Sequence, residues 1–209
     1  MKKLSMKKNA VAAMVVMSIF AATNVAHAAT LTQTDTSSWH VTANKVSSAS
    51  LAVNPTGSLP VITFTTENVG TTPTSTFSTA DAPFEVVLGG DASATAFTLT
   101  ANTITGQTRL ASTLNSSYLE IGVAYNSTPL TTASQTTIFS NGTTSGAFAG
   151  LASTALNNGV TAAGDKFVFS VASFSADGTN VIANPNALPN TTWSGNIGVQ
   201  FTATWTVPA

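Results

Sequence analysis

The stretch Ile197 to Val207, IGVQFTATWTV, has the most regular alternation of apolar and polar residues in the chain. Such alternation predicts a β-strand with one face turned toward a core. The polar face holds Gln200 and three threonines, and the apolar face holds Val199, Phe201, Ala203, Trp205 and Val207. Large apolar residues on one strand face must be covered. The cover is either the domain's own core, as in any central strand, or a strand supplied from elsewhere.

Shorter alternating segments precede this strand, and turn residues such as Asn141-Gly142 and Asp177-Gly178 separate them. Short strands separated by turns predict an all-β sandwich in one domain. The segment from Ser145 to Gly164 is the exception, because it is rich in Ala, Gly and Leu and fits either one short helix or a long loop. The expected strands cover Val61 to Thr65, Phe84 to Leu88, Ala96 to Thr100, Tyr118 to Tyr125 and Lys166 to Phe174.

The first 28 residues have the three parts of a secretory signal peptide: a basic start, an apolar run from Ala10 to Ala22, and a small-x-small exit. We expect cleavage between Ala28 and Ala29. The alternative, a membrane anchor, is disfavoured because a span needs about 20 apolar residues. Cleavage would leave three basic and eight acidic residues, a side-chain balance of −5. The sequence thus predicts export and gives no basic patch for binding nucleic acid.

The residues that usually carry catalysis are scarce. Cys is absent, which excludes thiol catalysis, disulfides and Cys-based zinc sites. His40 is the one His after the expected cleavage site, and the eight acids are scattered without a motif. We therefore expect no enzyme activity, no catalytic residue, no metal site and no cofactor.

The region from Ala29 to residue 46 is extended and Thr-rich, with no turn signal before Asn44. A free extended segment of this kind can add a strand to the open sheet edge of another molecule. We expect Trp39, Val41 and Ala43 to be the inserted side chains, with Leu31 a weaker member. Asp35 would be costly to desolvate.

Several stretches make the chain resemble the major fimbrial (pilin) subunits of the bacterial common-pilus type, which are assembled by the alternate chaperone–usher route. The most specific is Trp193 to Trp205, in which a W-S-G turn leads into the terminal strand. The others are Trp39 with Ala43 to Lys45, Leu51 to Leu59, Ala92 to Leu99 and Ile121 to Asn126.

The resemblance implies an incomplete immunoglobulin-like β-sandwich with Greek-key topology, completed by a donated strand. Residues 29–46 would be the donor strand and 47–209 the pilin domain. The acceptor groove would be formed by Val199, Phe201, Ala203, Trp205 and Val207. It also implies a cell-surface fimbria that serves adhesion and biofilm formation. The implied partners are identical neighbouring subunits, a periplasmic chaperone, an outer-membrane usher and a tip adhesin.

Two other functions remain open. One is a fimbrial tip adhesin or sugar-binding module, although such proteins usually carry a separate binding domain and the exported chain leaves little room for one. The other is a secreted β-sandwich enzyme, which the scarcity of His and of grouped acids disfavours. Electron microscopy of fibres labelled for this protein separates these functions. Label along the whole fibre would indicate a major subunit, and label at the tip alone would indicate an adhesin.

Overall fold

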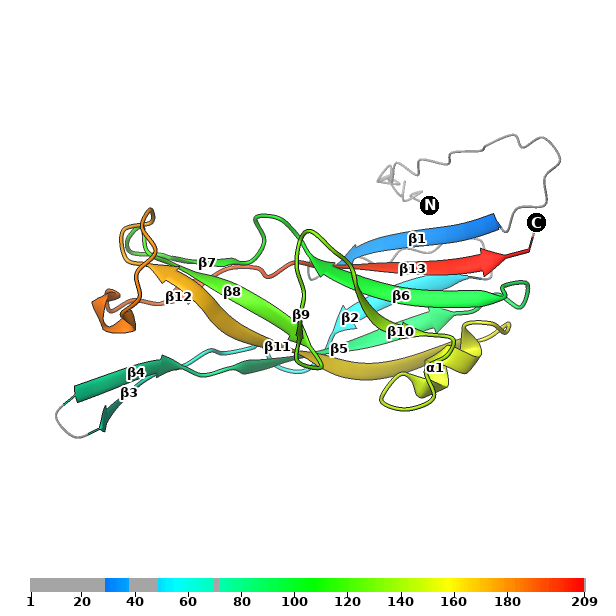
Figure 1. The fold of residues 1–209 in the computed structure, drawn as a ribbon, viewed down its shortest axis with the longest axis horizontal. Helices are drawn as coiled ribbons and strands as arrows, with labels where there is room; N and C mark the ends of the chain where they lie inside the picture. The colour runs from blue at the N-terminus through cyan, green and yellow to red at the C-terminus, as the bar shows by residue number, and fades with distance from the viewer. Residues whose placement is uncertain (1–28, 38–48, 70–71, 209) are drawn as a thin grey trace, which may run out of the picture.

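The computed structural model describes residues 29–37, 49–69 and 72–208, and within them the chain is almost entirely β-structure (Figure 1). This confirms the predicted all-β sandwich. The strands are β1 (Ala29–Ser37), β2 (Ser50–Pro55), β3 (Phe64–Val69), β4 (Thr72–Phe77), β5 (Ala80–Gly89), β6 (Ala96–Thr103), β7 (Arg109–Ser112), β8 (Tyr118–Tyr125), β9 (Thr128–Pro129), β10 (Thr136–Ser140), β11 (Val160–Ser175), β12 (Trp193–Ser194) and β13 (Val199–Val207).

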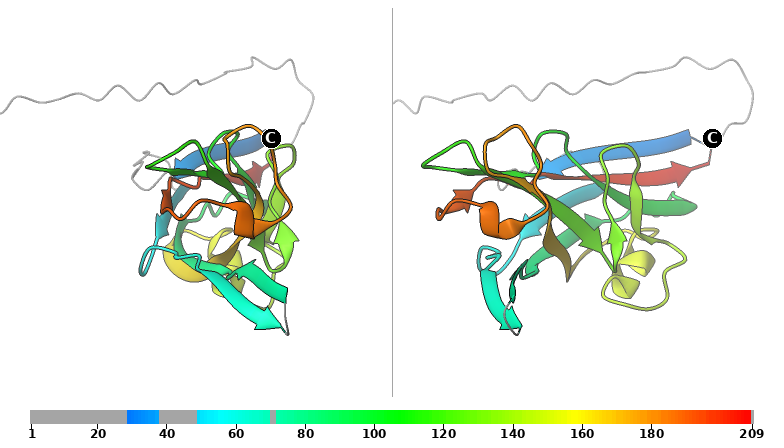
Figure 2. Two further views of the ribbon diagram at one scale, coloured as in Figure 1. Left: turned by 90° about the vertical axis from the view of Figure 1, so that its left-hand side faces the viewer. Right: turned by 60° about the vertical axis from the view of Figure 1, so that its left-hand side comes forward.

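Two antiparallel sheets form the sandwich, and Figure 2 shows them as two layers. One sheet has the order β1-β13-β6-β10. The other has the order β12-β7-β8-β11-β5-β2, with β9 added to β8. The long strand β11 connects the two halves of this second sheet, because its first part pairs with β5 and its second part pairs with β8. A separate hairpin, β3–β4, projects from one end (Figure 1).

Alternating side chains from both sheets build the core. Val86 and Leu88 of β5 face Leu99 and Ala101 of β6, and all four are fully buried. The period of two follows from strand geometry, in which successive side chains point to opposite faces. In β6 the burial alternates at every residue, because its second face is polar.

One helix covers one end of the sandwich, which we call the closed end. Helix α1 (Ala149–Thr154) lies within the Ala-rich segment, so this segment contains one short helix. Phe148, just before it, packs on Phe139 with ring centroids 5.3 Å apart. The indole Nε1 of Trp205 donates a hydrogen bond of 3.1 Å to the carbonyl oxygen of Ala155. A Cβ at Gly90 would lie 1.9 Å from the carbonyl oxygen of Thr154, so this close docking of α1 requires glycine.

The opposite end, which we call the open end, is formed by β7, β12, the β3–β4 hairpin and the loops between β11 and β12. It carries the 3-10 helix η1 (Pro185–Ala187), which lies against β4. Phe77 of β4 packs on Phe174 of β11 at 5.8 Å between ring centroids. The sequence predicts a strand from Val61, but β3 begins only at Phe64 and residues 59–63 are irregular.

Candidate functional site: the β13 edge and the open-end groove

Strand β13 pairs along its length with two strands. On one side it pairs with β6, from Val199 opposite Thr103 to Thr206 opposite Ala96. On the other side all nine residues of β1 pair with it, from Ala29 opposite Val207 to Ser37 opposite Val199. The first described segment and the last strand of the chain thus lie side by side, as Figure 1 shows.

The residues predicted to form the acceptor groove lie on the inner side of β13, and their role as an acceptor remains a prediction. Val199, Phe201, Ala203 and Trp205 are buried, and Val207 is half-buried at the strand end. The Phe201 ring lies 5.5 Å from that of Phe84 and 5.8 Å from that of Phe167. These contacts make β13 part of the core.

The predicted donor residues fall into two groups. Leu31 lies in β1 at the register position opposite Trp205, and Asp35 lies opposite Phe201. Trp39, Val41 and Ala43 lie outside the described residues, as do His40 and residues 1–28 with the expected signal peptide. The roles assigned to all of these residues therefore remain predictions. What sequence reasoning missed is that the whole of Ala29–Ser37, Asp35 included, pairs with β13.

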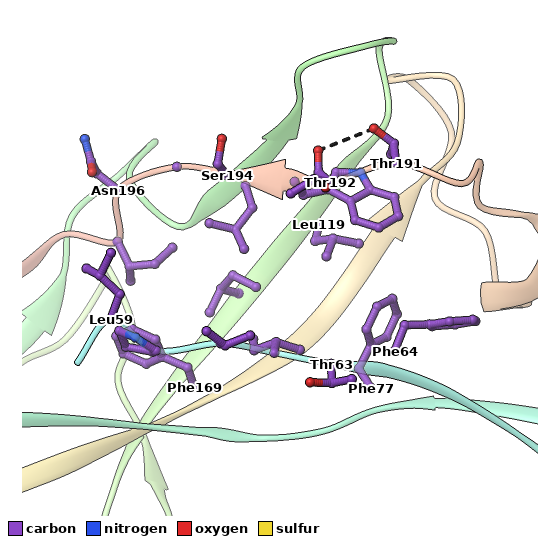
Figure 3. Close-up of a pocket in the computed structure, with 18 residues that line it drawn as sticks. Leu59, Thr63, Phe64, Phe77, Leu119, Phe169, Thr191, Thr192, Ser194 and Asn196 are labelled. Carbon is purple, nitrogen blue, oxygen red and sulfur yellow. Dashed lines mark hydrogen bonds between the residues drawn. The ribbon is translucent and has the colours of Figure 1, made fainter.

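An apolar groove of about 920 Å³ lies at the open end, and sequence analysis did not foresee it. Its lining comes from the 59–64 segment, β4, β7, β8, β11 and the stretch 191–197. Figure 3 shows Phe64 and Phe77 on one wall and Leu119 of β8 across from them. Leu59 is 72% exposed and Val61 73% exposed, although both line the groove. The signal in the sequence is the pair of apolar residues around Pro60, of which Val61 is predicted to begin a strand and Leu59 ends a stretch that carries the family resemblance.

A smaller pocket continues this groove toward β13. It has a volume of about 50 Å³, and Val53, Pro55, Val199 and Phe201 are among its lining residues. Phe169 and Ile197 line both pockets. The two pockets therefore adjoin each other at these residues.

The W-S-G turn shapes one wall of this groove. The indole Nε1 of Trp193 donates a hydrogen bond of 2.9 Å to the hydroxyl of Ser117, which is buried. A Cβ at Gly195 would lie 2.5 Å from the carbonyl oxygen of Arg109 in β7, so this approach also needs glycine. These contacts hold Trp193 to Ile197 against β7 and leave their other side facing the groove.

Charged groups lie beside the groove and not in it. None of its lining residues is charged. Arg109 pairs with Glu120 at 3.0 Å and its guanidinium lies 3.8 Å from the centre of the Tyr118 ring. Lys166 pairs with Asp81 at 2.6 Å, and this hydrogen bond raises the pKa of the lysine. An uncharged apolar groove is suited to apolar side chains.

Within residues 29–37, 49–69 and 72–208, no three His, Cys, Asp or Glu side chains come together as metal ligands would. In the same ranges, no helix has the length and apolar character needed to cross a membrane.

Comparison with known proteins gives consistent matches over almost the whole chain. A family model described as Fimbrillin MatB matches residues 32–205. The common pilus major fimbrillin subunit EcpA of Klebsiella pneumoniae strain 342 is 34% identical over 201 residues, covering 95% of this chain and 99% of that protein. EcpA of Escherichia coli strain UTI89 is 34% identical over 207 residues, covering 98% of this chain and 96% of the relative. The chain therefore belongs to the MatB fimbrillin family and is a major fimbrial subunit of the common-pilus type.

Proposed function

We propose that this protein is the repeating structural subunit of a cell-surface fimbria and that it polymerises by donor-strand exchange. In the fibre, residues 29–46 of one copy would enter the sandwich of the next copy and occupy the place of β1. The observation that carries the proposal is the position of β1, whose nine residues pair in unbroken register with the terminal strand β13.

The pairing can form equally well within one chain or between two. Main-chain hydrogen bonds between β1 and β13 do not depend on which copy supplies β1, and added strands bind in this way in other systems. Without β1, the edge of β13 beside its buried face would be unpaired. Such an edge attracts other strands and promotes aggregation. A second copy of the chain would satisfy it.

The connection between β1 and β2 favours exchange. β1 ends opposite Val199, near the open end, whereas β2 begins at Ser50 opposite Gly89, toward the closed end. The end of β1 and the start of β2 therefore lie toward opposite ends of the sandwich, an arrangement that favours supply of β1 by another copy.

The wider assembly follows from this proposal. A chain with an unpaired edge needs protection before it polymerises, so a periplasmic chaperone and an outer-membrane usher are the proposed partners, with a signal peptide at residues 1–28 for export. The fibre would be a homopolymer supporting adhesion and biofilm formation, with a separate tip adhesin. Both relatives are named as fimbrillin subunits, and this shared name supports a structural, non-enzymatic role.

Deletion of residues 29–45 tests the proposal. We expect the shortened chain to aggregate or be degraded when produced without a chaperone, because the face of β13 is left uncovered. It should also fail to form fibres seen by electron microscopy. A stable, soluble monomer of the shortened chain would contradict the proposal.

Antibody label on wild-type fibres should lie along their length, and label at the tip alone would favour the adhesin alternative.

A further inference from the structure

Two asparagines of the chain are followed directly by glycine, Asn141 before Gly142 and Asn158 before Gly159. An asparagine in this position can lose its side-chain amide without an enzyme, because the backbone nitrogen of the next residue attacks the side-chain carbonyl carbon. Glycine favours the attack, since it has no side chain to obstruct it and leaves the backbone free to turn. All four residues are exposed, so we expect the local restraints of the fold to decide which pair reacts.

Asn141 is held in a closed turn after β10. The backbone amide of Thr143 donates a hydrogen bond of 2.9 Å to the carbonyl oxygen of Ser140, and the amide of Ser140 donates one of 3.1 Å to the hydroxyl of Thr143. The Asn141 side chain is fixed as well, because its Oδ1 accepts a hydrogen bond of 3.1 Å from the amide of Phe97. The backbone amide of Asn141 donates another of 3.1 Å to the carbonyl oxygen of Phe97. These bonds hold the side chain on β6 and away from Gly142.

Asn158 is held much more weakly. It lies between α1 and β11, at a bend and not in a hydrogen-bonded turn. Its Oδ1 accepts a hydrogen bond from the backbone amide of Ala92, with a donor–acceptor distance of 3.4 Å. This is longer than the usual range of about 2.7–3.2 Å. The side chain can therefore leave this contact at little cost and turn toward the backbone nitrogen of Gly159.

The related pair Asp177–Gly178 is restrained like Asn141. An aspartate forms the same ring only when its carboxyl group is protonated. Hydrogen bonds from the backbone and side-chain amides of Asn180 hold the pKa of Asp177 below its usual value, so the carboxylate stays ionised. The backbone nitrogen of Gly178 also donates a hydrogen bond of 3.0 Å to the hydroxyl of Ser175. Of the three pairs, Asn158–Gly159 is thus the least restrained.

We propose that Asn158 is a site of spontaneous deamidation in the folded protein. The backbone nitrogen of Gly159 loses its proton to hydroxide and forms a bond to Cγ of Asn158. The bond from Cγ to the side-chain nitrogen breaks, and this nitrogen leaves as ammonia. Water then opens the resulting cyclic imide at one of its two carbonyl groups. The product at this position is aspartate or isoaspartate, in which the backbone runs through the side-chain carbon.

The reaction would disturb the docking of α1 at the closed end. The amide of Gly90 donates a hydrogen bond of 3.0 Å to the carbonyl oxygen of Gly159. A Cβ at Gly90 would lie 2.3 Å from the carbonyl oxygen of Asn157, so the residues just before the reacting pair pack directly on β5 and its end. Isoaspartate adds one methylene to the backbone here, and both products add a negative charge. We therefore expect the reacted chain to be less stable than the fresh one.

Mass spectrometry of the folded mature chain tests the site. The chain is kept in mildly alkaline buffer made with ¹⁸O-labelled water, which marks only the molecules that react during the incubation. Peptide fragmentation then locates the label. We expect the label to appear at Asn158 at least fivefold faster than at Asn141. Equal rates at the two asparagines, faster reaction at Asn141, or no reaction at Asn158 would overturn the proposal.

The same incubation in concentrated urea tests whether the fold causes the difference. Unfolding removes the hydrogen bonds that restrain Asn141, while both asparagines keep their following glycine. We expect the two sites to react at similar rates in the unfolded chain. If Asn158 stays at least fivefold faster in urea, the difference comes from neighbouring sequence and the structural argument is wrong.

Two matched variants test the attack by the glycine nitrogen. A Cβ at Gly159 would have Cγ2 of Thr154 as its nearest neighbour, at 3.9 Å, and a Cβ at Gly142 would have the hydroxyl oxygen of Ser140 at 3.9 Å. Both sites thus have room for alanine. Gly159→Ala should slow the reaction of Asn158 at least fivefold, and Gly142→Ala should leave that rate unchanged. An equal effect of the two variants on Asn158 would contradict the proposal.

The effect on stability has its own test. Asn158→Gln retains an amide but would have to form a larger ring, so this variant should not react. Incubation should lower the urea midpoint of the wild-type chain and leave that of Asn158→Gln unchanged. An equal loss in both chains would show that reaction at Asn158 does not loosen the closed end.

Discussion

The two ends of the sandwich differ in how the apolar interior is covered. At the closed end, Trp205 of β13 is fully buried and donates a hydrogen bond to the carbonyl oxygen of Ala155, just after helix α1. At the open end, the same interior continues into a groove with exposed Leu59 and Val61. The contrast indicates that the closed end maintains the fold, and under the proposed function the open end would serve assembly.

The largest expected effect comes from a charge placed at the covered part of β13. Phe201→Asp would put a carboxylate among Phe84 and Phe167, where burial of an unpaired charge is severely unfavourable. We expect low periplasmic levels of this variant, because neither chaperone nor neighbour could cover the face. Trp39→Asp should leave the level near normal and impair polymerisation only. Immunoblots of periplasm measure both, and equal loss would mean that the extension also helps the single domain to fold.

Trp205→Ala should also destabilise the closed end strongly. Large-to-small changes of a fully buried tryptophan cost about 3–5 kcal/mol, and this one also removes the hydrogen bond to Ala155. Urea unfolding of the isolated mature chain measures the loss. A change below about 1 kcal/mol would show that α1 and β13 do not form one packed unit.

Trp193→Ala is the matching change at the open end and should cost less. The indole is only half-buried, so the main loss is the hydrogen bond to the buried Ser117, worth about 1–3 kcal/mol when its partner is left unsatisfied. Fibre stability should fall more than domain stability, since Trp193 lines the groove. If unfolding is affected as much as by Trp205→Ala, the proposed division between the two ends is wrong.

The smallest expected effect concerns pH and the loop after β11. Asp177 accepts hydrogen bonds from the backbone and side-chain amides of Asn180, the backbone amide of Thr179 and the hydroxyl of Ser175, and these hold its pKa below the usual value. Because folding lowers the pKa of this carboxyl below its unfolded-state value of about 3.9, Asp177 stabilises the folded state at pH values above about 3.9. This stabilisation is lost as the pH falls below that value.

The difference in unfolding free energy between wild type and Asp177→Ala should therefore be largest near neutral pH and narrow between about pH 4 and pH 2. Urea titrations at a series of pH values measure it. A difference that stays constant across this range would show that the Asp177 carboxylate has no stabilising role.

Strong alternation made much of the fold predictable. The expected strand Tyr118 to Tyr125 coincides with β8, and the expected terminal strand contains β13. In both, one face is buried in the core, so local pattern and tertiary packing agree. Val61 shows the limit of this reasoning, because a β-branched residue after Pro60 fits a strand locally, yet no neighbouring strand pairs with it among the described residues.

The site was predictable only in part. The apolar face of β13 could be read from its sequence, because one strand carries all of it. The groove could not, since its walls come from segments as far apart as Leu59 and Trp193, and only the sheet topology brings them together. The register of β1 on β13 could not be predicted either. Polar residues of β1, such as Asp35, interrupt the apolar pattern that would otherwise fix the register.

Inter-copy disulfide formation between β1 and β13 tests the exchange of β1 most directly. Two tagged chains, one with Thr32→Cys and the other with Thr204→Cys, can be linked only if β1 of one copy lies on β13 of the other. Donor-strand exchange predicts that oxidised mixed fibres give a dimer carrying both tags. Fibres that give no such dimer, while the double variant Thr32→Cys/Thr204→Cys closes a disulfide within each single chain, would contradict it.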